Sequence, residues 1–209
     1  MSERFYEQSG SDERRSAPAA ARNVAPIIAV FEQWLPEHGT VVELASGTGE
    51  HIVAFARHFP HLQWQPTDAS PDALRSIAAW RAANGSDNLL APLDLDARDH
   101  DWPVERAHAI LSINMVHISP WAAGIGLLDG AARLLEQGAP LILYGPWIES
   151  GVETASSNRA FDADLRRRNP DWGLRSVEDF DQAAAARGLA LVERRRMPAN
   201  NLMLLLRRS

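Results

Sequence analysis

The sequence contains no cysteine among its 209 residues. This absence excludes disulfides, thiolate catalysis and zinc sites built on cysteine, and we expect no metal site. The chain has no apolar run near the length of a membrane span, and its polar start lacks the apolar core of a secretion signal. We therefore expect a cytoplasmic protein without a membrane partner.

The chain also lacks an excess of positive charge. Its 21 basic and 27 acidic residues give a formal net charge of −6, so it has no general attraction to phosphate backbones. We do not expect nucleic acid as a partner, and we interpret the arginine runs at 166–168 and 194–196 as solvated helix or strand faces. An RNA contact would require both runs to converge beside the site.

The length and composition fit one globular domain. Apolar residues make up 45% of the chain and charged residues 23%, which is typical of a soluble globular protein. The polar stretch at residues 1–17 contains Ser9-Gly10-Ser11-Asp12. We predict a flexible lead-in over residues 1–17 and a single domain over residues 18–209.

A loop of small residues between a strand and a helix is the most informative motif. Val41–Leu44 leads into Ala45-Ser46-Gly47-Thr48-Gly49. Because glycine has no Cβ, this backbone can turn sharply and lie close to a ligand, while the next helix presents free N–H groups. The dinucleotide fingerprint requires a third glycine where this chain has Ile52, whose branched side chain would crowd the contact between helix and strand. The motif therefore favours S-adenosylmethionine over NAD.

Strands and helices alternate along most of the chain. Pro26 is expected in the first turn of a helix that Pro36 and Gly39 close. The pattern predicts strands over residues 41–44, 62–67, 89–95, 109–113 and 141–144, and helices over residues 50–59, 71–84 and 121–137, with Ser70 as a cap and Gly138 as a left-handed helix end.

The last third of the chain changes character. A helix through Phe161 and Leu165 precedes a second helix, which begins at a capping box of Ser176 with Asp179 and ends at Gly188. Strands over residues 189–196 and 201–208 are joined by four residues and must be antiparallel. The predicted fold class is α/β and Rossmann-like: a seven-stranded, mostly parallel sheet with a terminal antiparallel hairpin and helices on both faces. This is the arrangement of class I methyltransferases.

Acidic residues at strand ends are candidates for holding the cofactor. Asp68 ends the second strand, where its carboxylate can accept from both ribose hydroxyls; the alternative is a cap of the following helix. Glu43 ends the first strand, where an isolated buried charge would be costly. We expect it to accept from the cofactor's ammonium group, directly or through a water molecule, and the alternative is a salt bridge to an arginine.

Two aspartates compete for the adenine amino group. Asp94 and Asp96 fall on one side of the third strand, and we favour Asp96 because it lies nearer the strand end, with the N–H of Ala97 meeting the ring. Asn114, after the fourth strand, is suited to orienting a polar substrate or the methionine end.

His117 is the candidate catalytic base, although a structural hydrogen bond is the more common role of a histidine in such a loop. The remaining six histidines are expected on loops or helix surfaces: His38, His51, His58, His61, His100 and His108.

Six segments resemble the class I S-adenosylmethionine-dependent methyltransferases and, more narrowly, the methyltransferase-like 26 family, long catalogued as a domain of unknown function. They are residues 16–23, 43–51, 64–68, 112–118, 157–162 and 197–202. The resemblance implies the seven-stranded fold and cofactor roles for Glu43, Gly47, Asp68 and Asp96, and it implies no particular substrate. Ala45 departs from the general pattern, because glycine usually occupies this position of the loop.

These observations define a predicted site. Methyl transfer is an in-line displacement in which the enzyme mainly positions the nucleophile and excludes water, so a base is optional. The expected cofactor contacts are Arg22, Glu43, Ala45, Ser46, Gly47, Gly49, Asp68, Ala69, Asp96, Ala97, Asn114 and Met115. The expected pocket for a small-molecule substrate comprises Tyr144, Trp147, Asn158, Asp162 and Asn200, unless these residues only tie loops and fill the core. We predict a methyltransferase; the alternatives are a non-catalytic protein that binds S-adenosylmethionine, and an NAD(P)-dependent oxidoreductase.

Overall fold

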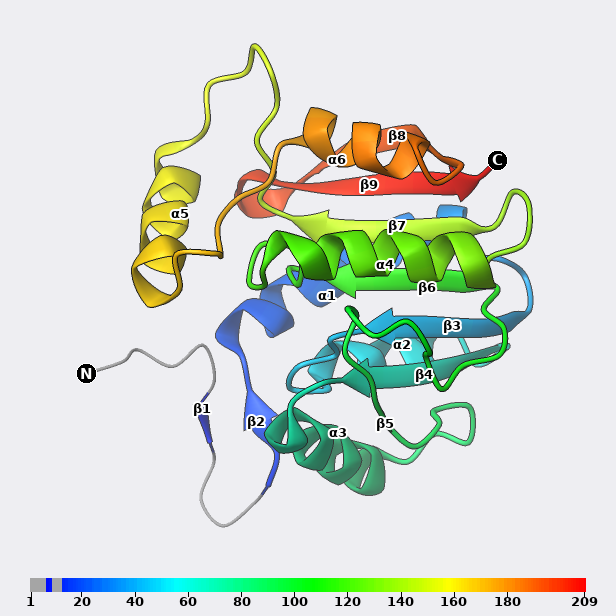
Figure 1. The fold of residues 1–209 in the computed structure, drawn as a ribbon. Helices are drawn as coiled ribbons and strands as arrows, with labels where there is room; N and C mark the ends of the chain where they lie inside the picture. Colours follow the sequence, from blue (N-terminus) through cyan, green and yellow to red (C-terminus); the bar gives the residue numbers. More distant parts are fainter. Residues whose placement is uncertain (1–6, 9–12) are drawn as a thin grey trace. The chain divides into compact units, whose positions relative to one another are not determined.

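A computed structural model describes residues 7–8 and 13–209 of the chain (Figure 1). These residues fall into two compact units, the first ending at Leu95 and the second comprising Asp96–Ser209. Strands of both units form a seven-stranded sheet of order β5-β4-β3-β6-β7-β9-β8, which confirms the predicted fold class. No helix within the described ranges is long and apolar enough to cross a membrane.

The first unit alternates helices with parallel strands. Its elements are β1 (Glu7–Gln8), β2 (Arg15–Ser16), α1 (Pro18–Trp34), β3 (Gly39–Leu44), α2 (Glu50–His58), β4 (Leu62–Asp68), α3 (Pro71–Asn84) and β5 (Leu93–Asp94). Strand β4 pairs in parallel with both β3 and β5. Buried aromatic rings join the layers: Phe31 of α1 meets Phe55 of α2 edge-on at 4.9 Å, and Phe55 lies 5.6 Å from Trp64 of β4.

The start of α1 differs from the prediction. The helix begins at Pro18 rather than near Pro26, which lies inside it. Pro18 suits a first helical position because its missing N–H needs no partner there, and the alanines after it favour helix. Pro26 costs α1 one backbone hydrogen bond, and the apolar face of the helix, with Ile27, Val30 and Phe31 buried, holds the helix together across it.

Part of the predicted lead-in is bound to the first unit. Strand β2 pairs with β1, and the backbone N–H of Arg15 donates to Ser76 of α3 at 2.9 Å. Trp80 of α3 donates its indole N–H to the carbonyl of Arg15 at 2.9 Å, and the N–H of Ala17 donates to Glu50 at 2.6 Å. Residues 13–17 are therefore attached to α3 and to the start of α2, and the rest of the predicted lead-in, apart from β1, lies outside the described residues.

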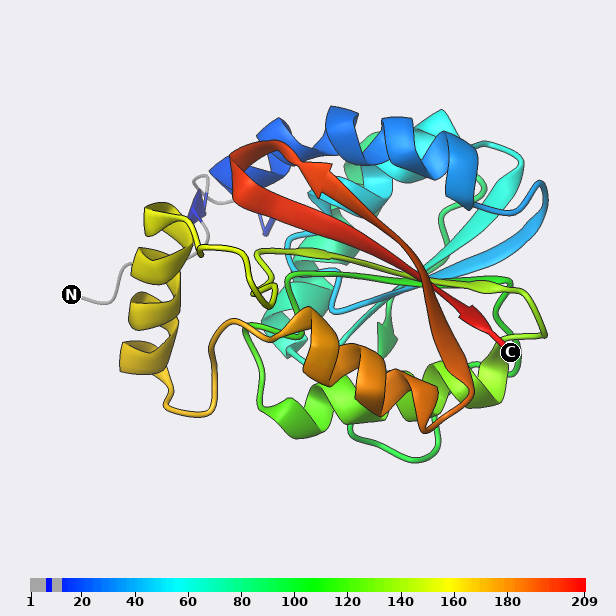
Figure 2. The ribbon, with the colours of Figure 1, turned by 90° about the horizontal axis from the view of Figure 1, so that it is seen from above.

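The second unit carries the terminal hairpin. Its elements are β6 (Ala109–Ile113), α4 (Trp121–Leu134), β7 (Pro140–Gly145), α5 (Ser156–Arg168), α6 (Val177–Ala185), β8 (Leu189–Met197), the short 3₁₀ turn η1 (Pro198–Asn200) and β9 (Asn201–Arg208). Strand β6 pairs in parallel with β7, while β9 runs antiparallel to both β7 and β8, as predicted. Helices α4 and α6 cover one face of these strands, and α5 stands at the end where β8 turns into β9 (Figures 1 and 2).

Three predicted boundaries are wrong. The third strand is reduced to Leu93–Asp94, with Leu89 making only an isolated bridge, because Pro92 has no N–H to continue the ladder. Helix α4 ends at Leu134, and Gly138, with φ of 78°, belongs to the turn before β7 instead of capping the helix. Helix α6 ends at Ala185, and Gly188 is reached only after a further turn.

Two glycines of α4 let a loop of the second unit pack tightly against this helix. A Cβ atom at Gly126 would lie 2.0 Å from the carbonyl oxygen of Ala97, and one at Gly130 would lie 2.2 Å from the ring of Trp102. These glycines lower the helix propensity of α4, so their value lies in the close approach they permit.

We predict that Gly126→Ala destabilises the protein although alanine is the better helix former. The added methyl group collides with backbone, which cannot rotate away, and the free energy of unfolding should fall by about 2 kcal/mol in urea denaturation. Gly85→Ala is the matched control, because a Cβ at Gly85 meets nothing within 4 Å. Equal stability of the two variants would contradict the packing argument.

Candidate functional site

The loop between β3 and α2 takes a left-handed path. Ala45, Gly47 and Gly49 have φ of 56°, 60° and 92°. This conformation costs alanine about 1 kcal/mol more than glycine, so Ala45 holds a strained position in which the wider methyltransferase pattern has glycine. Gly49 has a second constraint, because a Cβ there would lie 2.9 Å from the Cα of Ile77 in α3. The loop geometry agrees with the expected close approach of backbone to a ligand.

Asp68 holds this loop in place. One carboxylate oxygen accepts the N–H of Gly47 at 2.9 Å, and the other accepts the N–H of Ser70 at 2.9 Å. Burial raises the pKa of Asp68, and these backbone hydrogen bonds partly offset the rise. Asp68 therefore supports the turn before α3, while the cap of this helix is Ser70, whose side chain accepts the N–H of Ala73. A carboxylate has about four lone-pair sites, so acceptor capacity for hydroxyl groups remains.

Glu43 is a buried carboxylate that lacks a full set of partners. It is 1% exposed, and its Oε2 has no hydrogen-bond partner within the described part of the chain. Burial raises its pKa to about 7; a hydrogen bond from Ser46 lowers it, and the nearby charge of Asp68 raises it further. The predicted alternative, a salt bridge to an arginine, is not found among the described residues. The position would favour a ligand that brings a positive charge.

The raised pKa of Glu43 gives a testable pH dependence. Because folding disfavours the ionised form, Glu43 costs stability progressively as the pH rises from about 4.5 through 7. We predict that Glu43→Gln stabilises the ligand-free protein by about 3 kcal/mol at pH 8 and by less than about 1 kcal/mol at pH 5.

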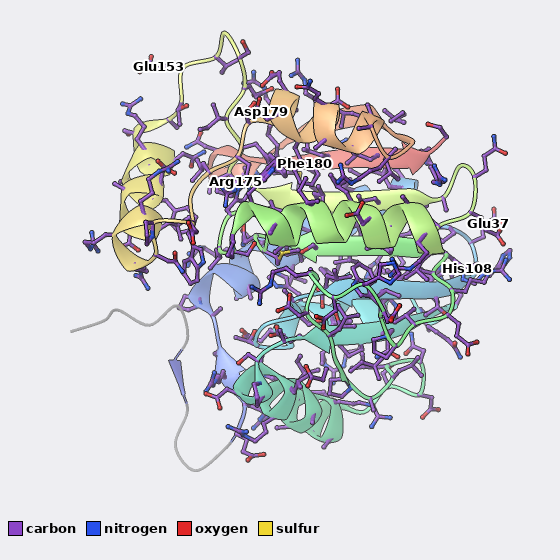
Figure 3. All side chains as sticks on the ribbon, viewed as in Figure 1. Glu37, His108, Glu153, Arg175, Asp179 and Phe180 are labelled. Carbon is purple, nitrogen blue, oxygen red and sulfur yellow. The ribbon has the colours of Figure 1, made fainter. Side chains whose placement is uncertain are left out.

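Urea denaturation at the two pH values measures this difference. Glu37→Gln, which removes an exposed carboxylate of the same unit (Figure 3), is the control and should change little at either pH. A Glu43→Gln advantage that does not grow with pH would contradict the assignment.

Two further predicted contacts of the first unit are surface residues, and a third, Ser46, is buried. Arg22 lies on an exposed part of α1, and Ala69 is exposed directly after Asp68. Ser46 is buried and ties the loop to β4, because its N–H donates to the carbonyl of Thr67 at 2.8 Å. Asp94 is exposed in β5.

His51 was expected on a helix surface; it lies in the first turn of α2 and is half-buried. Its ring stacks on Phe55, with centroids 5.7 Å apart, and its Nε2 is buried without a partner in the described ranges. Burial lowers the pKa of His51 to about 4. His51 lies in the first turn of α2, directly after the glycine loop. That position is a sign of proximity to the site, but sequence periodicity does not show that the imidazole Nε2 is buried there.

In the second unit, Asp96 and Ala97 follow β5. The Asp96 carboxylate accepts from the backbone N–H of Arg98 at 2.9 Å and pairs with its guanidinium group. Hydrogen bonds from Arg98 lower the pKa of Asp96, so this aspartate is ionised and already has one partner. The carbonyl of Ala97 faces Gly126 of α4.

The turn after β6 is built around Asn114. Its backbone is left-handed, with φ of 63°, and its N–H donates to the carbonyl of Tyr144 at 2.8 Å. Met115 follows in the same turn, which the N–H of His117 closes on the carbonyl of Asn114 at 3.0 Å.

His117 is fully buried. Its Nδ1 accepts the N–H of Arg175 at 3.3 Å, which places the ring proton on Nε2, and Nε2 has no partner among the residues described. Burial lowers the pKa of His117 to about 3, and the charge of Arg175 lowers it further. The imidazole is therefore neutral and offers a donor, with its acceptor already used.

Arg175 attaches the turn at residues 114–119 to the segment between α5 and α6 (Figure 3). It donates to the carbonyl oxygens of Val116 and Ser119 at 3.0 and 2.7 Å. Sequence reasoning missed this residue, because only the folded chain brings the two segments together.

A pocket of about 160 Å³ opens at the end of the sheet where α5 stands. It is lined by the loop after β7, the start of α5 and the β8–β9 turn: Trp147, Glu149, Val152, Glu153, Thr154, Ala155, Asn158, Arg196, Met197, Asn200, Asn201 and Leu202. Trp147, Asn158 and Asn200 of the predicted substrate pocket are among these residues. Tyr144 is buried in β7, and Asp162 accepts the N–H of Leu174 at 2.8 Å; neither lines the pocket.

The two asparagines also bind parts of the chain. Asn158 donates to the carbonyl of Asn200 at 2.8 Å, and the Asn200 side chain donates to Ser157 at 3.2 Å. The loop-tying role that we considered for them is therefore present in addition to their place in the pocket. Sequence reasoning missed Glu149, which has no motif of its own, and interpreted Arg196 only as part of the solvated arginine run at 194–196.

Most arginines of the two basic runs are paired. Arg166 pairs with Asp162, and both Arg167 and Arg168 pair with Asp164 along α5. On β8, Arg194 pairs with Glu149 and Arg195 with Glu193. This pairing is in keeping with solvated faces.

The chain belongs to a family of proteins of unknown function, DUF938, whose family model matches residues 14–208. Solved structures with a similar fold include the mitomycin 7-O-methyltransferase MmcR, with a TM-score of 0.76 and 18% identity over 90% of this chain and 55% of that one. CalO1, a methyltransferase in calicheamicin biosynthesis solved with SAH, has a TM-score of 0.74 and 16% identity over 91% and 54% of the two chains. An O-methyltransferase family protein from Burkholderia thailandensis has a TM-score of 0.75 and 18% identity over 91% and 57%. The chain thus spans a little over half the length of these proteins, and it shares their fold.

Proposed function

We propose that this protein is an S-adenosylmethionine-dependent methyltransferase acting on a small molecule. The observation that carries the proposal is the pair of buried carboxylates, Glu43 and Asp68, beside a left-handed glycine loop. The fold shared with methyltransferases and the resemblance to the methyltransferase-like 26 family support it. A single domain over residues 18–209 and a cytoplasmic location are parts of the same proposal.

The residues of the first unit fit the cofactor by their chemistry. The unpartnered Oε2 of Glu43 would accept from an ammonium group, and the free lone pairs of Asp68 would accept from ribose hydroxyls. The backbone of Ala45, Ser46, Gly47 and Gly49 would lie along the ligand, next to Ala69. We also propose cofactor contacts for five residues on the basis of the sequence: Arg22, Asp96, Ala97, Asn114 and Met115.

S-adenosylmethionine supplies an activated methyl group when bound, so the residues of this chain need mainly to hold the acceptor and exclude water. We propose that Trp147, Asn158 and Asn200 contribute to the acceptor pocket, with Tyr144 and Asp162 supporting the surrounding β7 and α5. His117 has no free acceptor nitrogen, so we propose that it positions the turn after β6 rather than acting as a base.

His117 offers no free acceptor nitrogen for use as a base, and this favours the second candidate, a non-catalytic protein that binds S-adenosylmethionine. An oxidoreductase remains the weaker reading, because fully buried Ile52 fills the position at which the dinucleotide fingerprint has glycine.

We predict that Asp68→Ala abolishes binding of S-adenosylhomocysteine in isothermal titration calorimetry. The variant loses the ribose acceptor and also frees the loop at Gly47, so affinity should fall by about 100-fold or more. Asp87→Asn, at an exposed position of the same unit, is the control and should bind as the unaltered protein does. Unchanged affinity in Asp68→Ala would refute the cofactor assignment.

Methyl transfer is tested with labelled S-adenosylmethionine and a small-molecule extract. We predict a labelled product that appears with the unaltered protein and not with Asp68→Ala. Cofactor binding without any product would instead favour the non-catalytic candidate.

A further inference from the structure

The pocket at the start of α5 has a charge imbalance. Of the carboxylates in its lining, Glu149 pairs with Arg194 at 3.1 Å and Glu153 pairs with Arg159 at 3.3 Å. Arg196 also lines the pocket, and no ion pair or hydrogen bond of its guanidinium group is found in residues 7–8 and 13–209. Both lining carboxylates thus have an arginine partner, and the guanidinium group of Arg196 has no carboxylate partner among the described residues.

Other groups around the pocket add donors. Helix α5 begins beside it, and its N-cap residue Ala155 provides no side-chain cap, so the first N–H groups of the helix keep their partial positive charge. Trp147 is 4% exposed, and its indole Nε1 has no hydrogen-bond partner within the described ranges. An unsatisfied buried donor is costly to stability.

The amides of the lining set the shape of the pocket but do not cancel this excess. The side-chain amides of Asn158 and Asn200 each use one N–H within the chain. Asn201 likewise donates to the carbonyl of Pro198 at 3.0 Å. The group that distinguishes this pocket electrostatically is therefore the guanidinium of Arg196.

We propose that this pocket binds a small molecule through an anionic group, a carboxylate or a phosphate monoester, held by Arg196. Its volume of about 160 Å³ suits a compact molecule and is below the range of about 300–1,000 Å³ typical of drug-sized ligands. This inference rests on the proposed function. If the pocket holds the methyl acceptor, that acceptor is a small acid that carries the methylated nucleophile on the same molecule.

The test uses the full chain and fluorine NMR at constant ionic strength. The probes are 4-fluorobenzoate, the neutral 4-fluorobenzamide of nearly the same shape, and 4-fluorophenyl phosphate. We expect both anions to bind and the amide not to bind. The preferred anion identifies whether the physiological group is a carboxylate or a phosphate.

Charge variants connect that binding to the pocket. Arg196→Gln should weaken binding of the preferred anion about tenfold or more, and Arg196→Lys should retain part of the affinity. Arg106→Gln, which removes an exposed arginine outside the pocket, is matched in net charge and should have no effect. Glu153→Gln removes an exposed negative charge from the lining and should tighten binding.

Equal binding of amide and anion, no binding of any probe at millimolar concentration, or full affinity in Arg196→Gln would each overturn the proposal. The probes are measured without S-adenosylmethionine. Loss of anion binding therefore leaves the cofactor assignment standing, and failure of the Asp68→Ala test leaves the anion site standing.

Discussion

The burial of two carboxylates at the ends of neighbouring parallel strands is the constraint on which the first unit depends. Asp68 is compensated by the N–H groups of Gly47 and Ser70, and this compensation requires the left-handed path through Ala45, Gly47 and Gly49. The shape of the loop and the charge of Asp68 are thus one feature: neither is stable without the other. Glu43 has a hydrogen bond from Ser46, but its Oε2 has no partner among the described residues, and the pKa of this carboxyl group is raised to about 7.

Each unit contains polar groups without a hydrogen-bond partner among the described residues, an acceptor in the first unit and donors in the second. Among the described residues, the Oε2 of Glu43 in the first unit lacks a donor, whereas in the second unit Arg196 and the indole Nε1 of Trp147 lack an acceptor. Both deficits lie in places with concave or loop-built surroundings, where polar groups serve binding more often than stability. A buried polar group that a fold retains without a partner costs stability, and binding of a complementary ligand recovers that cost.

The sequence predicted what is specified locally. The Ser70–Pro71 helix start, the glycine loop and the tight connection of the hairpin each have the chemistry that their conformation requires, and each was found. The connection is one residue shorter than predicted, because Met197 still pairs with Asn201. The start of α1 was predicted wrongly near Pro26, because tertiary packing outweighed the local preference of proline. The length of β5 was overestimated, because the missing N–H of Pro92 ended the pairing. Glu149 and Arg175 were missed, and Arg196 was assigned only to a solvated face, because pairing of β7 with β9, and the return of the chain after α5, bring together segments that lie far apart in the sequence.

The β8–β9 turn is a further argument that the pocket is functional. Ala199 and Asn200 are consecutive non-glycine residues with φ of 57° and 59°, a conformation that costs alanine about 1–2 kcal/mol and that asparagine adopts more readily. The hydrogen bond from Asn158 to the carbonyl of Asn200 holds this shape, and so does the one from Asn200 to Ser157. Two of the segments singled out in the sequence, residues 157–162 and 197–202, thus bind each other. Each amide uses one donor in that contact, which fixes the turn directly after Arg196 and so positions the arginine of the proposed anion site.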